Sequence, residues 1–166
     1  MKKIRKLQIQ VVLTVLVLCP CFAWAKITVT EKIFHLGIKG LPEWAEFSGK
    51  SPHGRNLSVS FESKANEKEA TLFLYQDDVK QGWRVSLNGK RLGNLERFES
   101  KVLHSLKVPA GTLKDGQNKL AVEAPTAVDD IFVGGAFIEL EPVDEVLSHS
   151  FLEVSAFDKK TSAPLP

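Results

Sequence analysis

Three side chains in this sequence have the chemistry needed to bind a polar, ring-shaped ligand such as a sugar. Trp44 follows Leu-Pro-Glu in a stretch typical of a loop, where an indole can offer a flat apolar surface to a pyranose. Tyr75 ends the run Thr-Leu-Phe-Leu-Tyr, and Arg84 follows Trp83 directly. A guanidinium beside an aromatic ring can hydrogen-bond sugar hydroxyls with its forked donors. Trp44, Tyr75 and Arg84 are therefore the candidate ligand-binding residues.

Each candidate also has a plain structural alternative, which the sequence alone leaves open. Trp44 can instead plug one end of the fold, and Arg84 can simply be solvated. Tyr75 and Phe73 share the strand face opposite two leucines, and residues on such a face often lie under a loop or a neighbouring sheet. A ligand surface and a covered face are both consistent with this pattern.

No catalytic constellation accompanies these residues. The four histidines, His35, His53, His104 and His149, stand singly and without metal-type spacing. The sequence has no Gly-rich phosphate loop, no Gly-x-Ser-x-Gly elbow and no His-Glu-x-x-His. Asp129-Asp130 can offer carboxylate oxygens to calcium, and the alternative is a solvated loop or an Asx turn. We therefore predict a chain that is not an enzyme and needs no cofactor, with a structural calcium as the alternative.

The first 25 residues have the pattern of a secretory signal peptide: basic residues at 2–6, an apolar run at 9–18, and Ala-Trp-Ala at 23–25. The run is shorter than the roughly 20 residues of a membrane-spanning helix. Cys19 gives a loose likeness to a lipoprotein signal, but a leucine precedes it where a small residue is wanted, and Pro20 follows. We predict cleavage after Ala25 and a secreted or periplasmic protein that is free of the membrane, with a lipoprotein as the alternative.

Removing this leader from the 166-residue chain leaves 141 residues, enough for a sizeable core. Both cysteines lie in the leader, so the remainder can form no disulfide and no thiolate metal site. Four of the 22 Lys and Arg residues also lie there, which leaves 18 against 20 Asp and Glu, a net charge of −2. Nothing in this balance favours nucleic acid or an anionic membrane surface as a partner.

From residue 26 onward, short alternating runs are separated by turn residues, and none has a sustained helical period. The pattern predicts an all-β sandwich or barrel, with a bulge at Gly134-Gly135 in the last strand. Strands are expected at 27–34, 57–61, 71–75, 83–87, 90–92, 102–108, 118–124 and 131–140, with a short one at 45–48.

A hairpin is expected around Asn88-Gly89, because both residue types tolerate the positive φ of a type I′ turn. Trp83 alternates with two further apolar residues before this turn, so its side chain is predicted to enter the core. The returning strand covers Lys90 to Leu92, and Gly93-Asn94 is expected to end it.

The end of the sequence predicts a further strand at 150–157, after a break at Pro142. A lone strand cannot bury a face. Residues 143–166 are therefore predicted to be a linker and the first strand of a truncated second β domain, although docking back on the sandwich is the alternative.

Three segments carry a family resemblance: Trp83 to Gly93 with its Asn-Gly-Lys, Leu106 to Leu120 with Pro-Ala-Gly-Thr-Leu and Gly-Gln-Asn-Lys-Leu, and Asp129 to Leu140. Together they resemble the galactose-binding-like jelly rolls found as accessory domains beside bacterial glycosidases and other secreted hydrolases. The likeness covers about residues 70 to 140. The tail from Val154 also looks like the opening of a carboxypeptidase-regulatory-like module.

The resemblance implies a jelly-roll β-sandwich over residues 26–142 that acts as a non-catalytic accessory module of a bacterial secreted protein, with a glycan as its ligand. The alternative is an architectural or docking domain of a larger secreted hydrolase whose catalytic part is absent from this chain. Related sandwiches sometimes hold a calcium ion with an acidic residue of the last strand, where this sequence has Ala136.

Overall fold

The computed structural model describes residues 26–43 and 51–147. Three expectations fall outside these ranges: the signal peptide at 1–25, Trp44 with the short strand after it, and the strand at 150–157. Among the residues that are described, no helix is long and apolar enough to cross a membrane.

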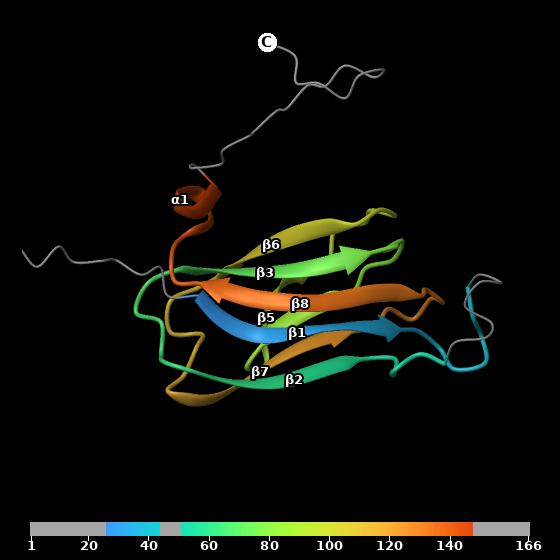
Figure 1. The fold of residues 1–166 in the computed structure, drawn as a ribbon, viewed down its shortest axis with the longest axis horizontal. Coiled ribbons are helices and arrows are strands. Elements are labelled where there is room, and N and C mark those ends of the chain that lie inside the picture. Colours follow the sequence, from blue (N-terminus) through green and yellow to red (C-terminus); the bar gives the residue numbers. More distant parts are fainter. Residues whose placement is uncertain (1–25, 44–50, 148–166) are drawn as a thin grey trace, which may run out of the picture.

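The described ranges fold into two four-stranded antiparallel sheets that pack face to face (Figure 1). The first sheet has the order β1-β8-β3-β6 and the second β2-β7-β4-β5. Apart from the β4–β5 hairpin, successive strands alternate between the sheets, which is the winding of a jelly roll. The predicted all-β jelly-roll sandwich is confirmed. Its elements are β1 (Lys26–Leu36), β2 (Leu57–Ser63), β3 (Ala70–Asp77), β4 (Arg84–Leu87), β5 (Lys90–Asn94), β6 (Val102–Val108), β7 (Gly116–Glu123), β8 (Ile131–Glu139) and α1 (Val143–Leu147).

The inward side chains of both sheets form one apolar core. Because alternate residues of a strand point to opposite faces, each strand contributes every second residue to it. Trp83 lies in this core with 1% of its surface exposed, as its alternation with apolar neighbours predicted. Other core residues at 1% exposure or less include Leu72, Leu74, Val85, Leu87, Leu120, Val122, Val133 and Ile138.

The β4–β5 hairpin turns at Asn88 and Gly89, whose φ angles of 52° and 80° are both left-handed. The predicted type I′ turn is therefore confirmed. The Asn88 side chain also ties the turn to β7, since its Oδ1 accepts the backbone N–H of Lys119 at 3.0 Å.

The expected end of β5 was wrong. Gly93-Asn94 does not break the strand, which continues to Asn94 past a bulge at Leu92. The bulge absorbs one extra residue, so Asn94 rather than Gly93 pairs with Arg84. This shift determines which side chains lie beside Arg84 on the outer face.

A second bulge lies at Gly134-Gly135 in β8, where it was predicted. Phe73 of β3 pairs with Phe137 of β8, but Tyr75 pairs with Gly134, so β8 has one extra residue between the two pairs. Gly134 has a φ of 149°, and a Cβ atom at this position would lie 2.0 Å from the backbone oxygen of Lys32. Only glycine fits this close approach of β8 to β1.

The buried carboxylate of Asp129 joins the β3–β4 and β7–β8 connections. Its Oδ2 accepts the indole N–H of Trp83 at 2.7 Å, and the backbone N–H groups of Gln81 at 2.9 Å and Lys80 at 3.3 Å. Its Oδ1 is buried without a hydrogen-bond partner. Burial raises the pKa of this carboxyl above its usual 3.8, and the nearby negative charge of Glu43 acts in the same direction.

Asp130 makes the equivalent link to β1. Its Oδ1 lies 2.9 Å from Nε2 of His35, and its Oδ2 accepts the backbone N–H of Glu43 at 2.6 Å. The Glu43 carboxylate in turn accepts the backbone N–H of Asp130 at 3.1 Å. Together these bonds fix the end of the sandwich where the loops meet.

The segment after β8 holds one feature that the sequence analysis did not anticipate. Val143–Leu147, placed in a predicted linker, forms the short helix α1. The backbone N–H groups of Glu145 and Val146 both donate to the carbonyl of Pro142. A single turn of this kind has no hydrophobic period to detect.

Replacing Gly89 of the hairpin turn and Gly134 of the β8 bulge with alanine should cost different amounts of unfolding free energy. Gly89→Ala places a methyl group in open space, so it costs about 1–2 kcal/mol of left-handed backbone strain. Gly134→Ala also drives Cβ into the Lys32 carbonyl, so its loss of unfolding free energy should be larger. Urea denaturation of both variants measures the difference, and equal losses would contradict the close contact.

Replacing Asp129 tests the buried carboxylate. Because its pKa is raised in the folded state, its contribution to stability is greatest below pH 4 and is lost as pH rises through the folded pKa. Asp129→Asn keeps a hydrogen-bond acceptor but has no charge. The stability of this variant should therefore not decrease as pH rises through the folded pKa, and the variant should be at least as stable as the parent at pH 7. Asp129→Leu removes the acceptor and should cost about 1–3 kcal/mol. Urea denaturation between pH 4 and 7 measures both, and parallel pH profiles for Asp129→Asn and the parent would count against the raised pKa.

Candidate functional site

Tyr75 and Arg84 lie on opposite outer faces of the sandwich. Tyr75 belongs to β3 and points away from the core on the first sheet, while Arg84 begins β4 and points outward from the second. The structure therefore does not bring these two candidate residues together. Trp44, the third, lies outside the described residues.

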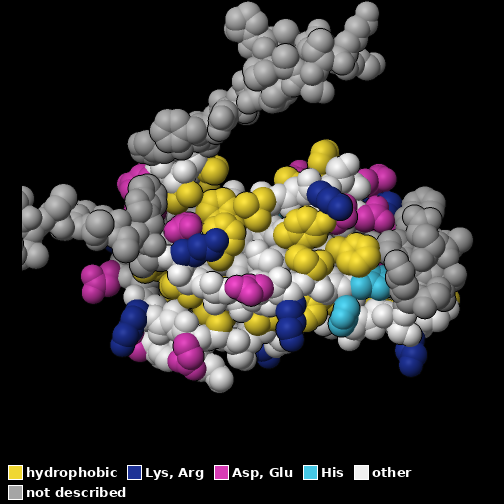
Figure 2. Space-filling model, in the orientation of Figure 1, with side chains coloured by type: hydrophobic (Ala, Val, Ile, Leu, Met, Phe, Trp, Pro, Cys, Tyr) yellow, Lys and Arg dark blue, Asp and Glu magenta, His cyan; other side chains and the backbone are white. Residues whose placement is uncertain are grey.

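Tyr75 borders a hollow of about 460 Å³ on the outer face of the first sheet, lined by Ile33, Tyr75, Asp77, Lys101 and Phe132. We call it the Tyr75 hollow. Figure 2 shows hydrophobic side chains gathered on this face of the molecule, with charged groups around them. The residues come together through strand register, because Asp77 follows Tyr75 on the same face of β3 and pairs with Phe132 of β8.

The polar groups of the Tyr75 hollow are linked to its aromatic wall. The Tyr75 hydroxyl donates to Oδ2 of Asp77 at 3.3 Å. Burial raises the pKa of the Tyr75 phenol, and the charge of Asp77 and this hydrogen bond raise it further. The phenol therefore keeps its proton at neutral pH, and one ring presents both an apolar face and a hydrogen-bonding edge.

A second, smaller hollow lies on the same face, lined by Lys26, Thr28, Thr30, Glu31, Gly135, Ala136 and Phe137, with a volume of about 220 Å³. It adjoins the Tyr75 hollow at the glycine bulge, since a Cβ on Gly135 would lie 3.6 Å from Cβ of Tyr75. The Lys26 ammonium lies 3.8 Å from the centre of the Phe137 ring.

Phe73, the companion of Tyr75, is covered rather than open. Its ring stacks on Phe137 at a centroid distance of 5.1 Å, and only 6% of its surface is exposed. Of the two interpretations of this strand face, the covered one holds for Phe73, whereas Tyr75 borders an open hollow.

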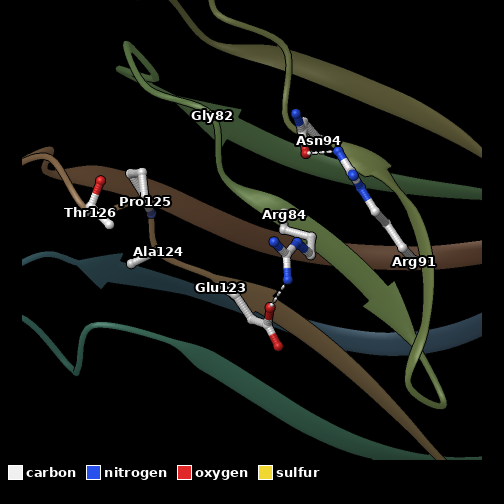
Figure 3. Close-up of a pocket in the computed structure, with 8 residues that line it drawn as sticks. All are labelled: Gly82, Arg84, Arg91, Asn94, Glu123, Ala124, Pro125 and Thr126. Carbon is white, nitrogen blue, oxygen red and sulfur yellow. Dashed lines mark hydrogen bonds and ion pairs between the residues drawn. The ribbon is translucent and has the colours of Figure 1, made fainter.

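Arg84 lines a polar pocket of about 310 Å³ on the outer face of the second sheet (Figure 3). We call it the arginine pocket; its lining residues are Gly82, Arg84, Arg91, Asn94, Glu123, Ala124, Pro125 and Thr126. Arg84 pairs with Asn94 of β5 on one side and with Glu123 of β7 on the other. Its Nη1 forms an ion pair with Glu123 at 3.2 Å, and Nη2 of Arg91 donates to Oδ1 of Asn94 at 3.0 Å.

Several lining residues were missed by the sequence analysis. Asp77 could have been found from its position two residues after Tyr75, which places both on one strand face. Phe132 and Glu123 have no such local signal, because they reach their hollows only through pairing with strands distant in sequence.

Asp129 and Asp130, which were the alternative calcium site, direct their carboxylates mainly to N–H groups of the protein. Both carboxylate oxygens of Asp130 and the Oδ2 of Asp129 accept hydrogen bonds from N–H groups. Of these four oxygens, only Asp129 Oδ1 has no hydrogen-bond partner among the described residues. Calcium takes about six to eight oxygen ligands. Over residues 26–43 and 51–147, no group of three or more His, Cys, Asp or Glu side chains could hold a metal ion.

No protein-family model matches this sequence, and no curated protein matches it either. Among solved structures, the chain is similar to an exo-β-1,3-galactanase from Phanerochaete chrysosporium, with a TM-score of 0.38 and 20% identity over 66% of this chain and 29% of the galactanase. It is also similar to a CBM36 carbohydrate-binding module in complex with calcium and xylotriose, with a TM-score of 0.37 and 16% identity over 69% of this chain and 98% of that module. A third similar structure is a family 35 carbohydrate-binding module from an environmental isolate, with a TM-score of 0.35 and 16% identity over 68% of this chain and 97% of that module. All three TM-scores lie below 0.5, so the function rests on the chain's own residues.

Proposed function

We propose that this chain is an exported, non-catalytic glycan-binding module and that the Tyr75 hollow is its sugar site. The observation that carries the proposal is the hollow's composition: the rings of Tyr75 and Phe132 stand beside the carboxylate of Asp77 and the ammonium of Lys101. A pyranose has the matching character, with apolar C–H faces and a rim of hydroxyls.

Most side chains that line the hollow come from strands, so the site is formed before a ligand binds. Tyr75 and Asp77 belong to β3, which pairs with β8 on one side and β6 on the other. A ligand that enters therefore meets side chains already held by the sheet, and little ordering cost opposes binding. The adjoining hollow beyond Gly135 offers room for a second sugar ring.

Calorimetric titration of the purified protein with neutral oligosaccharides, including xylotriose and β-1,3-galactotriose, tests the proposal. Tyr75→Ala removes the ring and should weaken binding at least about tenfold, whereas Tyr75→Phe keeps the ring and should weaken it less. Phe98→Ala is the matched control, because Phe98 is an exposed aromatic residue, 51% accessible, that is not among the residues lining the hollow.

Two results would contradict this site. If Tyr75→Ala binds as well as the parent, the sugar lies elsewhere. If no neutral saccharide binds at all, the architectural role beside a hydrolase domain becomes the better proposal.

A further inference from the structure

The arginines of this protein are concentrated at one place. From residue 26 onward the chain contains 14 lysines but only four arginines: Arg55, Arg84, Arg91 and Arg97. The lysines are spread along the chain, and none of those in residues 26–43 and 51–147 lines the arginine pocket. Two of the four arginines line that pocket, and the other two lie close to residues of its lining, although the four come from two separate stretches of sequence.

The four arginines differ in how they contact the pocket. Arg84 and Arg91 line it directly from β4 and β5 (Figure 3). Arg55 is not a lining residue, but its Nη2 donates to the carbonyl of the lining residue Pro125 at 2.7 Å. Arg97 approaches the remaining side, since its Nη2 lies 3.7 Å from the position of a Cβ on Gly82.

The charged residues that line the pocket give it a net positive charge. Glu123 is the one acid among its lining residues, and it pairs with Arg84 through a single nitrogen, Nη1. Two guanidinium groups, those of Arg84 and Arg91, therefore line the pocket against one carboxylate. The Arg84–Glu123 pair is exposed, with side-chain accessibilities of 57% and 49%, so water and a competing anion can both reach it.

We propose that the arginine pocket binds the carboxylate of an acidic sugar, a uronate residue. A guanidinium presents two parallel N–H groups that match the two oxygens of a carboxylate, which a lysine ammonium does not do. The side chains of Asn94 and Thr126 add hydrogen-bonding groups suited to sugar hydroxyls. The volume of about 310 Å³ exceeds what a carboxylate alone would fill.

The ligand carboxylate takes the position that Glu123 now holds on Arg84, and the ligand also recruits Arg91 from its bond with Asn94. Glu123 is thus an internal competitor. The sugar part of this ligand rests on the proposed glycan-binding function, but the pocket is separate from the Tyr75 hollow and lies on the opposite face.

Calorimetric titration of the full chain with α-1,4-trigalacturonate tests the inference. Arg84→Gln and Arg91→Gln should each weaken binding at least tenfold, and Glu123→Gln should strengthen it several-fold because the competitor loses its charge. Lys90→Gln, a change at an exposed neighbour on β5 outside the pocket, should bind as the parent does. Tyr75→Ala should also leave trigalacturonate binding unchanged, which separates this site from the proposed neutral-sugar site.

The same trisaccharide with its carboxylates reduced to alcohols should lose binding to the arginine pocket. Equal affinity for the acidic and the reduced sugar would overturn the inference, and so would unchanged binding in Arg91→Gln or no binding at all. Equal affinity for a glutamate-rich peptide would overturn the sugar assignment. Loss of neutral-sugar binding in Tyr75→Ala with trigalacturonate binding intact supports both sites, whereas failure of neutral sugars alone counts only against the Tyr75 hollow.

Discussion

The buried hydrogen bond between the indole of Trp83 and Asp129 is the contact on which the outer surfaces depend. One carboxylate oxygen gathers three N–H donors from residues 80–83, so the β3–β4 connection is fixed to the segment that precedes β8. Gly82 and Arg84 stand on one side of this junction, and Ala124 to Thr126 stand just before Asp129 on the other. The two walls of the arginine pocket are therefore held by a bond inside the sandwich.

The two outer faces differ in composition because alternate residues of a strand point to opposite faces, so the outward residues of each sheet are not constrained by packing in the core. The first sheet places aromatic rings outward around Tyr75, and the second places Arg84 and Glu123 outward. The shared core between them keeps these surfaces a full sandwich apart. No single sugar ring can contact both, so the two proposed sites require different ligands or different parts of one long chain.

Features with a local cause could be predicted from the sequence. The Asn88-Gly89 turn and the Gly134-Gly135 bulge each depend on a residue type suited to an unusual backbone, and both were found. Strand alternation likewise assigned Trp83 to the core. The neighbours of Arg84 could not be predicted, because alternation gives the face of a residue but not the strand beside it. Glu123 is 39 residues away, and the bulge at Leu92 shifts β5 by one position.

Glu123 also gives the arginine pocket a way to discriminate among anions. A ligand that offers only a carboxylate exchanges one ion pair with Arg84 for another of the same kind, so the exchange yields little net free energy. A larger acid must add contacts that Glu123 does not make, and Arg91, Asn94 and Thr126 surround the position where it would make them. Because a ligand must displace Glu123 from Arg84, the proposed uronate site should bind small carboxylates weakly and favour carboxylates carried on a ring with hydroxyl groups.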